Sequence, residues 1–594
     1  MGMTPVTPEF LAVARGEAPA DLLLANARVI NVFTCEIIPA SVAVSAGRIA
    51  AVLGPEECPA AARVIDLKGA VLSPGFIDAH MHVESSMLPP SEFASLAVPH
   101  GTTGAVLDPH EIANVLGVEG IRAIMRDAAE SGDERGPTMN FLFALSSCVP
   151  SCHLETSGAK IEARDLEPFF DDERVVALAE MMNFPGAAMG VPAVLEKINL
   201  GLSRGVVDGH APGLSGRLLQ AYAAARISSD HECATIGEAR EKLRLGMRIF
   251  IREGSAARNL EALLPLVTPA SRTRFCFCTD DRHPDDLLRE GHIDHVIRRA
   301  VSMGMELATA AAIGSFHTAR HYGLGWRGAI APGYHADLVV LDEPRTPRVR
   351  SVYFEGRHVA ENGELVVKPR RSSSERAAVF PRSGVRLPAG FGANSLRVAS
   401  TRADPLRIRV IGMNPHQLVT DHLVMRAKLE DGAVVSDVER DVLKIAVVER
   451  HRGGGNIGIG FVRGFGLRRG ALASTVGHDA HNLTIVGTND PDMALAARTL
   501  AEVGGGQCAV MDGRVLAVLA LPIAGLMGDQ GAEAVIERQR ALLAASRELG
   551  CPHSDPFMPL SFMPLPVIPK LKISDVGLVD VERFEVVGLV VGEE

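Results

Sequence analysis

Short apolar runs separated by turn residues give the first part of the chain a β pattern. Residues 21–30 and 42–53 are typical of strands, with Gly47 at a hairpin turn between two of them. The same strand, turn, strand pattern returns at 328–342 and 352–357. We therefore predict one split β-sandwich domain, built from residues 1–73 and 327–385, with the intervening chain inserted into it.

Between these flanks, apolar strand segments alternate with segments of helical apolar spacing. Helical spacing is seen, for example, at 121–129, 217–225 and 236–245. The predicted strands are the one that opens at Val71 and then 102–108, 138–147, 175–181, 206–211, 227–232, 247–254 and 275–280. Eight strands alternating with helices favour an α/β fold, a parallel (β/α)8 barrel over residues 74–326.

The last part of the chain has a third pattern. Strand-like segments such as 407–411 and 442–448 dominate it, and 531–549 is its one clear helix. Two glycine triplets, at 453–455 and 504–506, lack the Lys and Ser/Thr of a phosphate-binding loop, so they indicate tight turns. We predict an additional C-terminal α+β domain over residues 394–594.

Composition narrows the class of partner. The formal net charge of −11 argues against nucleic acid or an anionic membrane as a partner, because both favour a basic protein surface. The sequence has no run near the ~18 apolar residues of a membrane span. Nine scattered cysteines suit a reducing compartment. These features predict a cytoplasmic protein that binds neither nucleic acid nor a membrane.

Metal-ligand side chains recur where the predicted barrel strands end. His80 and His82 are two residues apart, so on a strand their imidazoles face the same side. Each of these residues alone has an ordinary explanation, such as a capping Asp or a loop His. Together they predict two divalent metals at the C-terminal face of the barrel, with Glu180 as a bridging carboxylate. The six predicted ligands are His80, His82, Glu180, His210, His231 and Asp280.

The chain resembles known enzymes in several long motifs. Residues 74–82 (PGFIDAHMH), the order of the ligands and the split β domain resemble the amidohydrolase superfamily. A narrower resemblance, to the adenine deaminase family, covers nearly the whole chain and is carried by residues 82–86, 108–112, 251–259, 278–282, 477–482 and 565–569. One departure is Gly477, where that family is expected to have Ser.

The resemblance implies hydrolytic deamination of adenine to hypoxanthine and ammonia, by attack of metal-activated hydroxide on C6. It also implies Mn or Fe as the metals, with Zn as the alternative. Asp280 would take the proton of the water, with Asp281 as its rival for this role. Glu84 is the candidate for the second acid/base, since it lies two residues past His82, on the same face if the strand continues. The alternative role for Glu84 is an orienting hydrogen bond to a ligand histidine.

Three further pairs of polar residues are candidates for binding the substrate. His110 and Glu111 follow the second strand, and Arg252 and Glu253 end the seventh; loop stabilisation and a buried ion pair are their alternative roles. His478 and Asp479 lie in the last domain, in a loop that we expect near the active site of its own chain or of a neighbouring subunit. A turn is the alternative.

Other functions remain open at this point. Another amidohydrolase, such as a deacetylase or a cyclic-amide hydrolase, would use a similar site, although the latter commonly needs a carboxylated bridging lysine where this chain has Glu180. A metal-free scaffold on the same fold is the alternative from another class. A homo-oligomer is expected.

Overall fold

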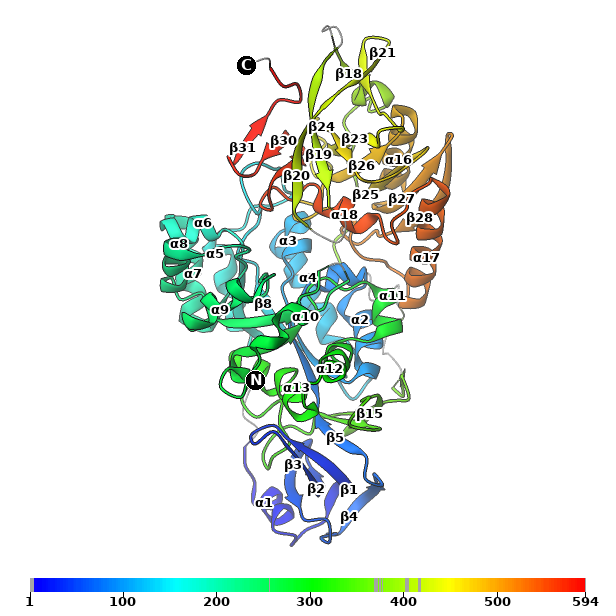
Figure 1. Cartoon of the computed structure of the whole chain (residues 1–594). Coiled ribbons are helices and arrows are strands. Elements are labelled where there is room, and N and C mark those ends of the chain that lie inside the picture. Colours follow the sequence, from blue (N-terminus) through cyan, green and yellow to red (C-terminus); the bar gives the residue numbers. More distant parts are fainter. Residues whose placement is uncertain are drawn as a thin grey trace.

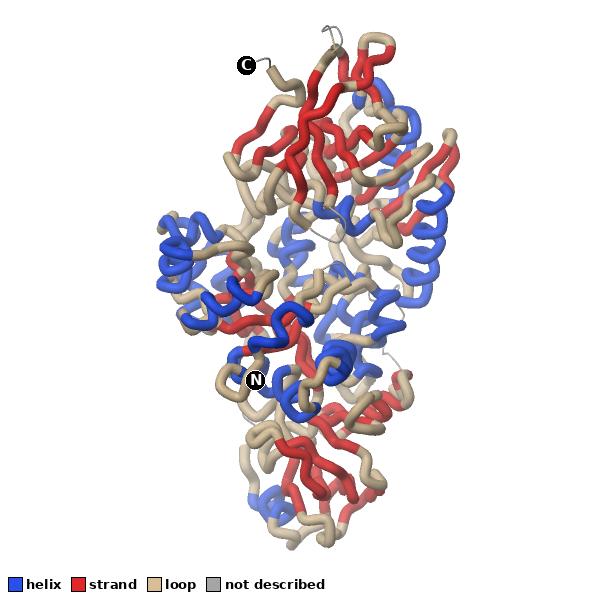
Figure 2. Tube along the Cα trace, in the orientation of Figure 1, coloured by secondary structure: helices blue, strands red, loops and turns tan. Residues whose placement is uncertain are grey.

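The computed structural model describes residues 5–592 apart from 256, 368–371, 373–374, 376–377, 401–404 and 415–417. The predicted 251–259 motif thus includes one residue, Ala256, outside the described part. Figure 1 shows a small β-rich region at one end of the molecule, a helix-rich region in the middle and a second β-rich region at the other end. In Figure 2, the strands gather at both ends and helices surround the strands of the middle.

The first sheet combines strands from two distant parts of the chain. Its order is β17-β16-β15-β14-β5-β1-β2-β3, and β4 pairs with β1. Antiparallel β14 pairs with β5, which joins the N-terminal strands to those after the middle region. The strands are β1 (Ala20–Asn31), β2 (Glu36–Ser45), β3 (Arg48–Leu53), β4 (Ala61–Asp66), β5 (Val71–Pro74), β14 (Leu338–Leu341), β15 (Val349–Phe354), β16 (Arg357–Glu361) and β17 (Glu364–Leu365).

A curled parallel sheet of the (β/α)8 type forms the middle region. Its strands run in the order β10-β9-β8-β7-β6 and β11-β12-β13. Backbone hydrogen bonds join the two groups, from Asp280 N to His80 O (3.0 Å) and from Ser228 N to Val207 O (2.8 Å). The strands are β6 (Phe76–Met81), β7 (Thr102–Leu107), β8 (Asn140–Leu145), β9 (Val175–Met181), β10 (Val206–Gly209), β11 (Ser229–Asp230), β12 (Arg248–Arg252) and β13 (Phe275–Cys278).

Helices cover the outside of this sheet because each carries an apolar stripe. In α12 (Ile293–Ser302), the buried residues Ile293, Val296, Ile297 and Ala300 follow the three- and four-residue spacing of one helix face. The strands are buried on both sides instead, so β7 is apolar or small throughout. The other longer helices of this region are α2 (Pro90–Ala97), α3 (His110–Leu116), α4 (Val118–Ala129), α7 (Pro192–Arg204), α8 (Gly216–Ala224), α9 (Ile236–Arg244), α11 (Pro284–Glu290) and α13 (Leu307–Ile313).

The last region is built on a mixed sheet in the order β20-β19-β24-β23-β26-β25-β27-β28. Helix α17 (Ala532–Glu548) lies between this region and the middle one, because it packs on both β28 and α11. The strands are β19 (Arg407–Met413), β20 (Thr420–Arg426), β23 (Val442–Val448), β24 (Ile457–Arg463), β25 (Ala471–Ser474), β26 (Leu483–Gly487), β27 (Gly506–Met511) and β28 (Arg514–Ala520). Helices α16 (Asp490–Val503) and α18 (Phe557–Phe562) also pack on it, and β29 (Leu571–Ser574), β30 (Gly577–Asp580) and β31 (Glu585–Val587) form a further small sheet.

Two predictions about these elements were wrong. The stretch that opens at Val71 is two strands rather than one, because the chain leaves the first sheet at Gly75 and enters the barrel-type sheet with β6. A Cβ at Gly75 would lie 2.1 Å from Thr103 Oγ1, so only glycine fits this crossing. The last region also has a second long helix, α16, which the sequence pattern did not indicate.

Among the described residues, no helix is both long enough and apolar enough to cross a membrane.

Candidate metal centre and reaction cavity

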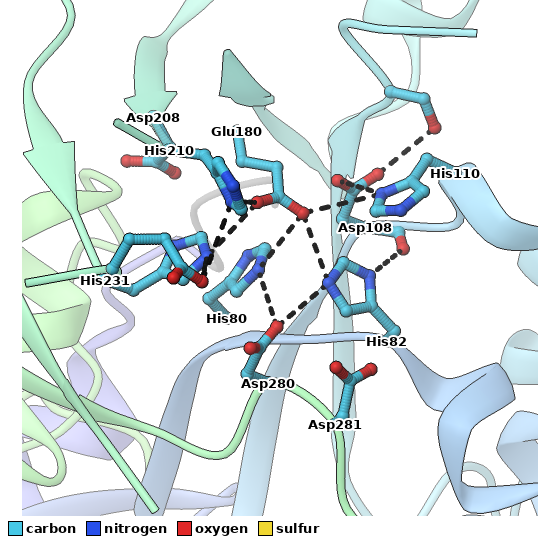
Figure 3. A network of polar contacts seen from close by, with 12 residues as sticks. His80, His82, Asp108, His110, Glu180, Asp208, His210, His231, Asp280 and Asp281 are labelled. Carbon is cyan, nitrogen blue, oxygen red and sulfur yellow. Dashed lines mark hydrogen bonds and ion pairs between the residues drawn. The ribbon is translucent and has the colours of Figure 1, made fainter. Parts of the chain in front are cut away.

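The six predicted ligands lie together at the ends of the parallel strands. His80 is in β6 and Glu180 in β9, while His210, His231 and Asp280 lie within two residues of the ends of β10, β11 and β13. Figure 3 shows their side chains pointing toward one another, with Glu180 in the middle. All six residues are at most 8% exposed. Parallel strands bring these positions together because their carboxyl ends meet at one face.

Glu180 contacts imidazoles on two sides. Its Oε2 lies 2.7 Å from His210 Nδ1 and 3.2 Å from His231 Nε2. Its Oε1 lies 3.2 Å from His82 Nε2 and 3.7 Å from His80 Nε2. Burial raises the pKa of Glu180, but His210 and His231 more than offset this effect, so the pKa lies well below the usual range. A carboxylate with one oxygen toward each histidine pair has the geometry of a bridging ligand.

Asp280 completes the cluster from the end of β13. Its Oδ1 lies 3.1 Å from His82 Nε2 and 3.5 Å from His80 Nε2, and its Oδ2 accepts a hydrogen bond of 2.6 Å from Arg252 Nη1. The backbone at Asp280 is left-handed, with φ +58°, a conformation that Asp tolerates better than most residues. Its neighbour Asp281 accepts instead from Ser85 Oγ at 2.5 Å. The two predicted rivals therefore have different surroundings.

The residues present fit a pair of divalent metals. His80 Nε2 is buried and has no hydrogen-bond partner in the described structure, although it faces the carboxylates. An imidazole nitrogen is rarely buried in this way unless it binds something. His82 Nδ1 lies 3.1 Å from the Asp108 carbonyl oxygen, which directs Nε2 into the cluster. The predicted ligands His80, His231 and Asp280 have ligand atoms within 4.8 Å of one another, and so do Glu180, His210 and His231.

Two residues at this centre were not singled out from the sequence. Asp108 accepts a hydrogen bond from Ser146 and lies 2.9 Å from His110 Nδ1. Glu232 is paired with Arg252 and lies 3.5 Å from His231 Nε2. Asp108 opens the 108–112 motif, and Glu232 directly follows the predicted ligand His231, so these positions were the available signal.

The structure overturns the premise for Glu84. Strand β6 ends at Met81, and a 3-10 helix, η1 (Val83–Ser86), follows it, so the same-face argument fails. The left-handed Met87, which caps η1, fixes this turn. Glu84 is buried, and its Oε1 accepts from Ile112 N at 3.1 Å. Its Oε2 has no hydrogen-bond partner among the described residues, and burial raises the pKa of Glu84 to about 7. It does not hydrogen-bond a ligand histidine.

The side chains of Arg252 and Glu253, at the end of β12, have different surroundings. Arg252 lies between the carboxylates of Glu232 and Asp280, and it lines the cavity beside the cluster. Glu253 is paired with Arg299 and accepts from Leu260 N at 3.1 Å. It does not line that cavity. Arg252 thus faces the cavity, whereas Glu253 faces Arg299, and the described structure shows no ion pair between Arg252 and Glu253.

The loop of the last region reaches this centre within the same chain. His478 Nδ1 lies 2.6 Å from Glu111 Oε1, and His481 Nε2 contacts Glu111 Oε2. The His478 ring also stacks on Phe562, with centroids 4.3 Å apart. Asp479 Oδ1 lies 3.9 Å from His110 Nε2. Residues more than 360 positions apart in the sequence thus form one buried polar cluster.

Two adjoining cavities surround the cluster. The inner one, which we call the reaction cavity, has a volume of about 30 Å³. It is lined by the predicted ligands other than His80, and by His110, Glu111, His478 and Asp479. The outer one, which we call the vestibule, has a volume of about 920 Å³. Both are lined by Glu232, Arg252, Leu418, Phe562 and Ile568. These five residues form the boundary between the two spaces.

Comparison with known proteins gives consistent matches. A family profile described as "Amidohydrolase family" matches residues 71–365, and one described as "Adenine deaminase C-terminal domain" matches residues 417–585. Among solved structures, a D-hydantoinase has a TM-score of 0.45 and 16% identity, covering 58% of this chain and 96% of that one.

Two curated relatives span almost the whole sequence. A protein named adenine deaminase from Desulfatibacillum aliphaticivorans is 46% identical over 590 residues, which covers 98% of this chain and 100% of the relative. Another of that name, from Methanothrix thermoacetophila, is 46% identical over 577 residues, covering 97% of this chain and 98% of the relative. On this identity and coverage, the chain belongs to the adenine deaminase family of the amidohydrolases.

Proposed function

We propose that this protein hydrolyses adenine to hypoxanthine and ammonia. The observation that carries the proposal is the buried group of four imidazoles and two carboxylates at the strand ends, with His80 Nε2 left without a hydrogen bond. The family membership supports adenine as the substrate, since the relatives are named for it. No lysine lines the reaction cavity in the described structure, which disfavours a cyclic-amide hydrolase that uses a carboxylated lysine.

The predicted ligands would hold two divalent metals, with Glu180 between them. Metals in this position would lower the pKa of a water that they share, and so supply a nucleophile for C6 of the purine. We propose Mn or Fe, with Zn as the alternative, because imidazole and carboxylate ligands suit all three.

Asp280 is the group that we assign to accept the proton of the attacking water. Its Oδ1 faces the histidines of the centre, and Arg252 fixes its Oδ2 at 2.6 Å. Burial raises the pKa of Asp280, but Arg252 and the histidines hold it well below the usual range, so the carboxylate is ionised and can act as a base. Water adds at C6 and gives one proton to Asp280. The bond between C6 and the exocyclic amino nitrogen then breaks, the hydroxyl at C6 loses its proton to become the carbonyl, and the amino group takes a proton to leave as ammonia.

The ring nitrogen beside C6 gains a proton in the product, so a second proton donor or relay is required. Glu84 lies outside the reaction cavity, in a smaller cavity of about 10 Å³ that Asp281 and His478 also line. Because these two residues line both spaces, Glu84 would act through them rather than on the base itself. His110, Glu111, Arg252 and His478 line the reaction cavity, and we assign them to hold the base.

Adenine is larger than the reaction cavity, which has room for about two waters. We propose that the base enters from the vestibule and displaces the apolar side chains at the boundary, Leu418, Phe562 and Ile568. The protein would then enclose the base and exclude bulk water during the reaction.

The same proposal extends to the organisation of the protein. We propose a (β/α)8 barrel over 74–326, a β-sandwich domain from 1–73 and 327–385, and a C-terminal domain over 394–594. The first sheet supports the split β domain, because it contains strands from both 1–73 and 327–385. A homo-oligomer in the cytoplasm, acting on a small molecule and water, completes the proposal.

Ammonia release tests the function directly. Protein purified with Mn supplied is incubated with adenine and with a panel of other purine and pyrimidine bases. We expect release from adenine, with hypoxanthine formed in equal amount. Release from another base alone, or from none with two metals bound per chain, would contradict the proposal.

A further inference from the structure

One carboxylate of the reaction cavity has an oxygen without a partner. Four of the other carboxylates that line it, Glu111, Glu180, Glu232 and Asp280, have both oxygens in contact with histidines or Arg252. Asp479 Oδ2 is buried and has no hydrogen-bond partner among the described residues. The nearest cation to Asp479 is His110, 3.9 Å from Oδ1, which is too far for a hydrogen bond.

A carboxylate oxygen that is buried without a hydrogen-bond partner is costly, because nothing replaces its lost contact with water. Asp479 is only 2% exposed, and its neighbour His478 is fixed by Glu111 and by the stacked Phe562. The oxygen therefore has little freedom to turn toward solvent. Such a group is suited to a ligand that brings a donor into the cavity.

Asp479 also lies on the inner wall of the reaction cavity. It does not line the vestibule, unlike Glu232 and Arg252 on the boundary. The vestibule, with its volume of about 920 Å³, is the space that can hold a bulky part of the substrate. A donor that contacts Asp479 therefore belongs to the part of the substrate that the reaction cavity encloses. A bulky substituent at that donor would meet the wall.

We propose that Asp479 accepts a hydrogen bond from the imidazole-ring N–H of the free purine base and so selects bases over nucleosides. The inference rests on the proposed function. Free adenine carries one such N–H, at N9 or N7. A nucleoside has none, because its sugar is bonded to N9. A buried acceptor left unpaired rejects an analogue that lacks the donor far better than an apolar pocket rejects extra bulk. The C-terminal region thus contributes a specificity-determining residue to the barrel.

The test pairs a change in the protein with a change in the ligand. Michaelis constants for adenine, and inhibition constants for 9-methyladenine and 7-methyladenine, are measured in the wild type, Asp479→Ala and Asp479→Asn. We expect Asp479→Ala to raise KM for adenine about 10-fold or more, as for a charged hydrogen bond. The inhibition constant of Asp479→Ala for the methylated base that blocks the contacted nitrogen should stay close to the wild-type value. The variant should therefore lose the wild type's discrimination between free and methylated base. Asp479→Asn should keep part of it, because the amide oxygen still accepts.

Asn482→Ala is the matched control in the same loop. Asn482 donates to Thr156 O at 2.8 Å and does not line the reaction cavity. It should leave the ratio of methylated to free base unchanged, which separates loss of the contact from loss of loop order. Metal content and circular dichroism are recorded for each variant.

Three results would overturn the inference. Equal weakening of free and methylated bases in both Asp479 variants would show that the residue does not meet the imidazole N–H. Unchanged constants would show that it does not contact the base. Deamination of adenosine as fast as adenine by the wild type would place N9 toward the vestibule. If the wild type releases no ammonia from adenine, the proposed function fails instead.

Discussion

Replacing Asp280 with Asn removes its ability to act as a base and keeps the size of its side chain. The amide has nearly the same size and keeps one oxygen toward the histidines, but it cannot take a proton from water. Arg252 loses one of two carboxylate partners and keeps Glu232, with Nη2 and Oε2 3.2 Å apart. The buried guanidinium is therefore not left without an anion, and we expect the variant to fold.

The size of the effect follows from the contacts of Asp280. A positioned general base contributes about 10²–10⁴-fold to a rate. Because Asp280 is also within 3.5 Å of two ligand histidines, the loss should lie toward the upper end of that range. A 10⁴-fold loss in kcat corresponds to about 5.5 kcal/mol in the activation free energy.

The assay is steady-state ammonia release from adenine, with elemental analysis of the same samples. We expect Asp280→Asn to lose turnover while it keeps at least part of its metal. Asp281→Asn is the matched control, since Asp281 lines the cavity but accepts from Ser85 at 2.5 Å. An active Asp280→Asn together with an inactive Asp281→Asn would reverse the assignment.

Three other substitutions test the surroundings. Glu180→Gln should reduce the metal content from two per chain, measured by elemental analysis, because the amide offers one oxygen in place of a bridge; full metal and activity would contradict this role. Glu84→Gln should cost kcat for adenine far less than Asp280→Asn, because Glu84 lies outside the reaction cavity; an equal loss would place it directly in the proton path. Lys242→Met should lower the thermal unfolding temperature, because Asp230 loses a buried cation 2.7 Å away; an unchanged temperature would contradict this.

The metal centre could be predicted from the sequence because of one property of parallel sheets. The strands are buried on both faces, so they stand out as apolar runs, and the first polar side chains after them all fall at one face. His210 and Asp280 could be assigned in this way although they are 70 residues apart, with no knowledge of the strand register. The prediction needed only the approximate end of each strand.

Glu84 shows where this reasoning stops. Its assignment depended on whether β6 continues for three more residues, and the 3-10 turn that ends the strand is stabilised by the left-handed Met87. Methionine has no preference for that conformation, so the turn leaves no signal in the sequence. Helix α16 is a different case, because its sequence does carry helix signals that the prediction overlooked: Asn489 as N-cap, acidic residues in the first turn and left-handed Gly504 at the C-terminal end.

The pairing of Glu111 with two histidines was beyond sequence pattern alone, because 367 residues separate it from His478.

The consequence of this pairing is structural as well as chemical. Burial raises the pKa of Glu111, but His478 and His481 more than offset this and hold it well below the usual range. Burial lowers the pKa of His478, yet Glu111 outweighs that effect and raises it to about 9. Glu111 and His478 therefore form a buried ion pair between the barrel-type region and the last region. Breaking such a pair by removing one partner costs about 3–5 kcal/mol, because it leaves an uncompensated charge. A barrel without the last region would leave Glu111 with His110, 3.4 Å away, in place of His478 and His481, and would lose Asp479 from the cavity wall. The C-terminal region thus supplies part of the wall of the reaction cavity, and we expect the two regions to function only as one chain.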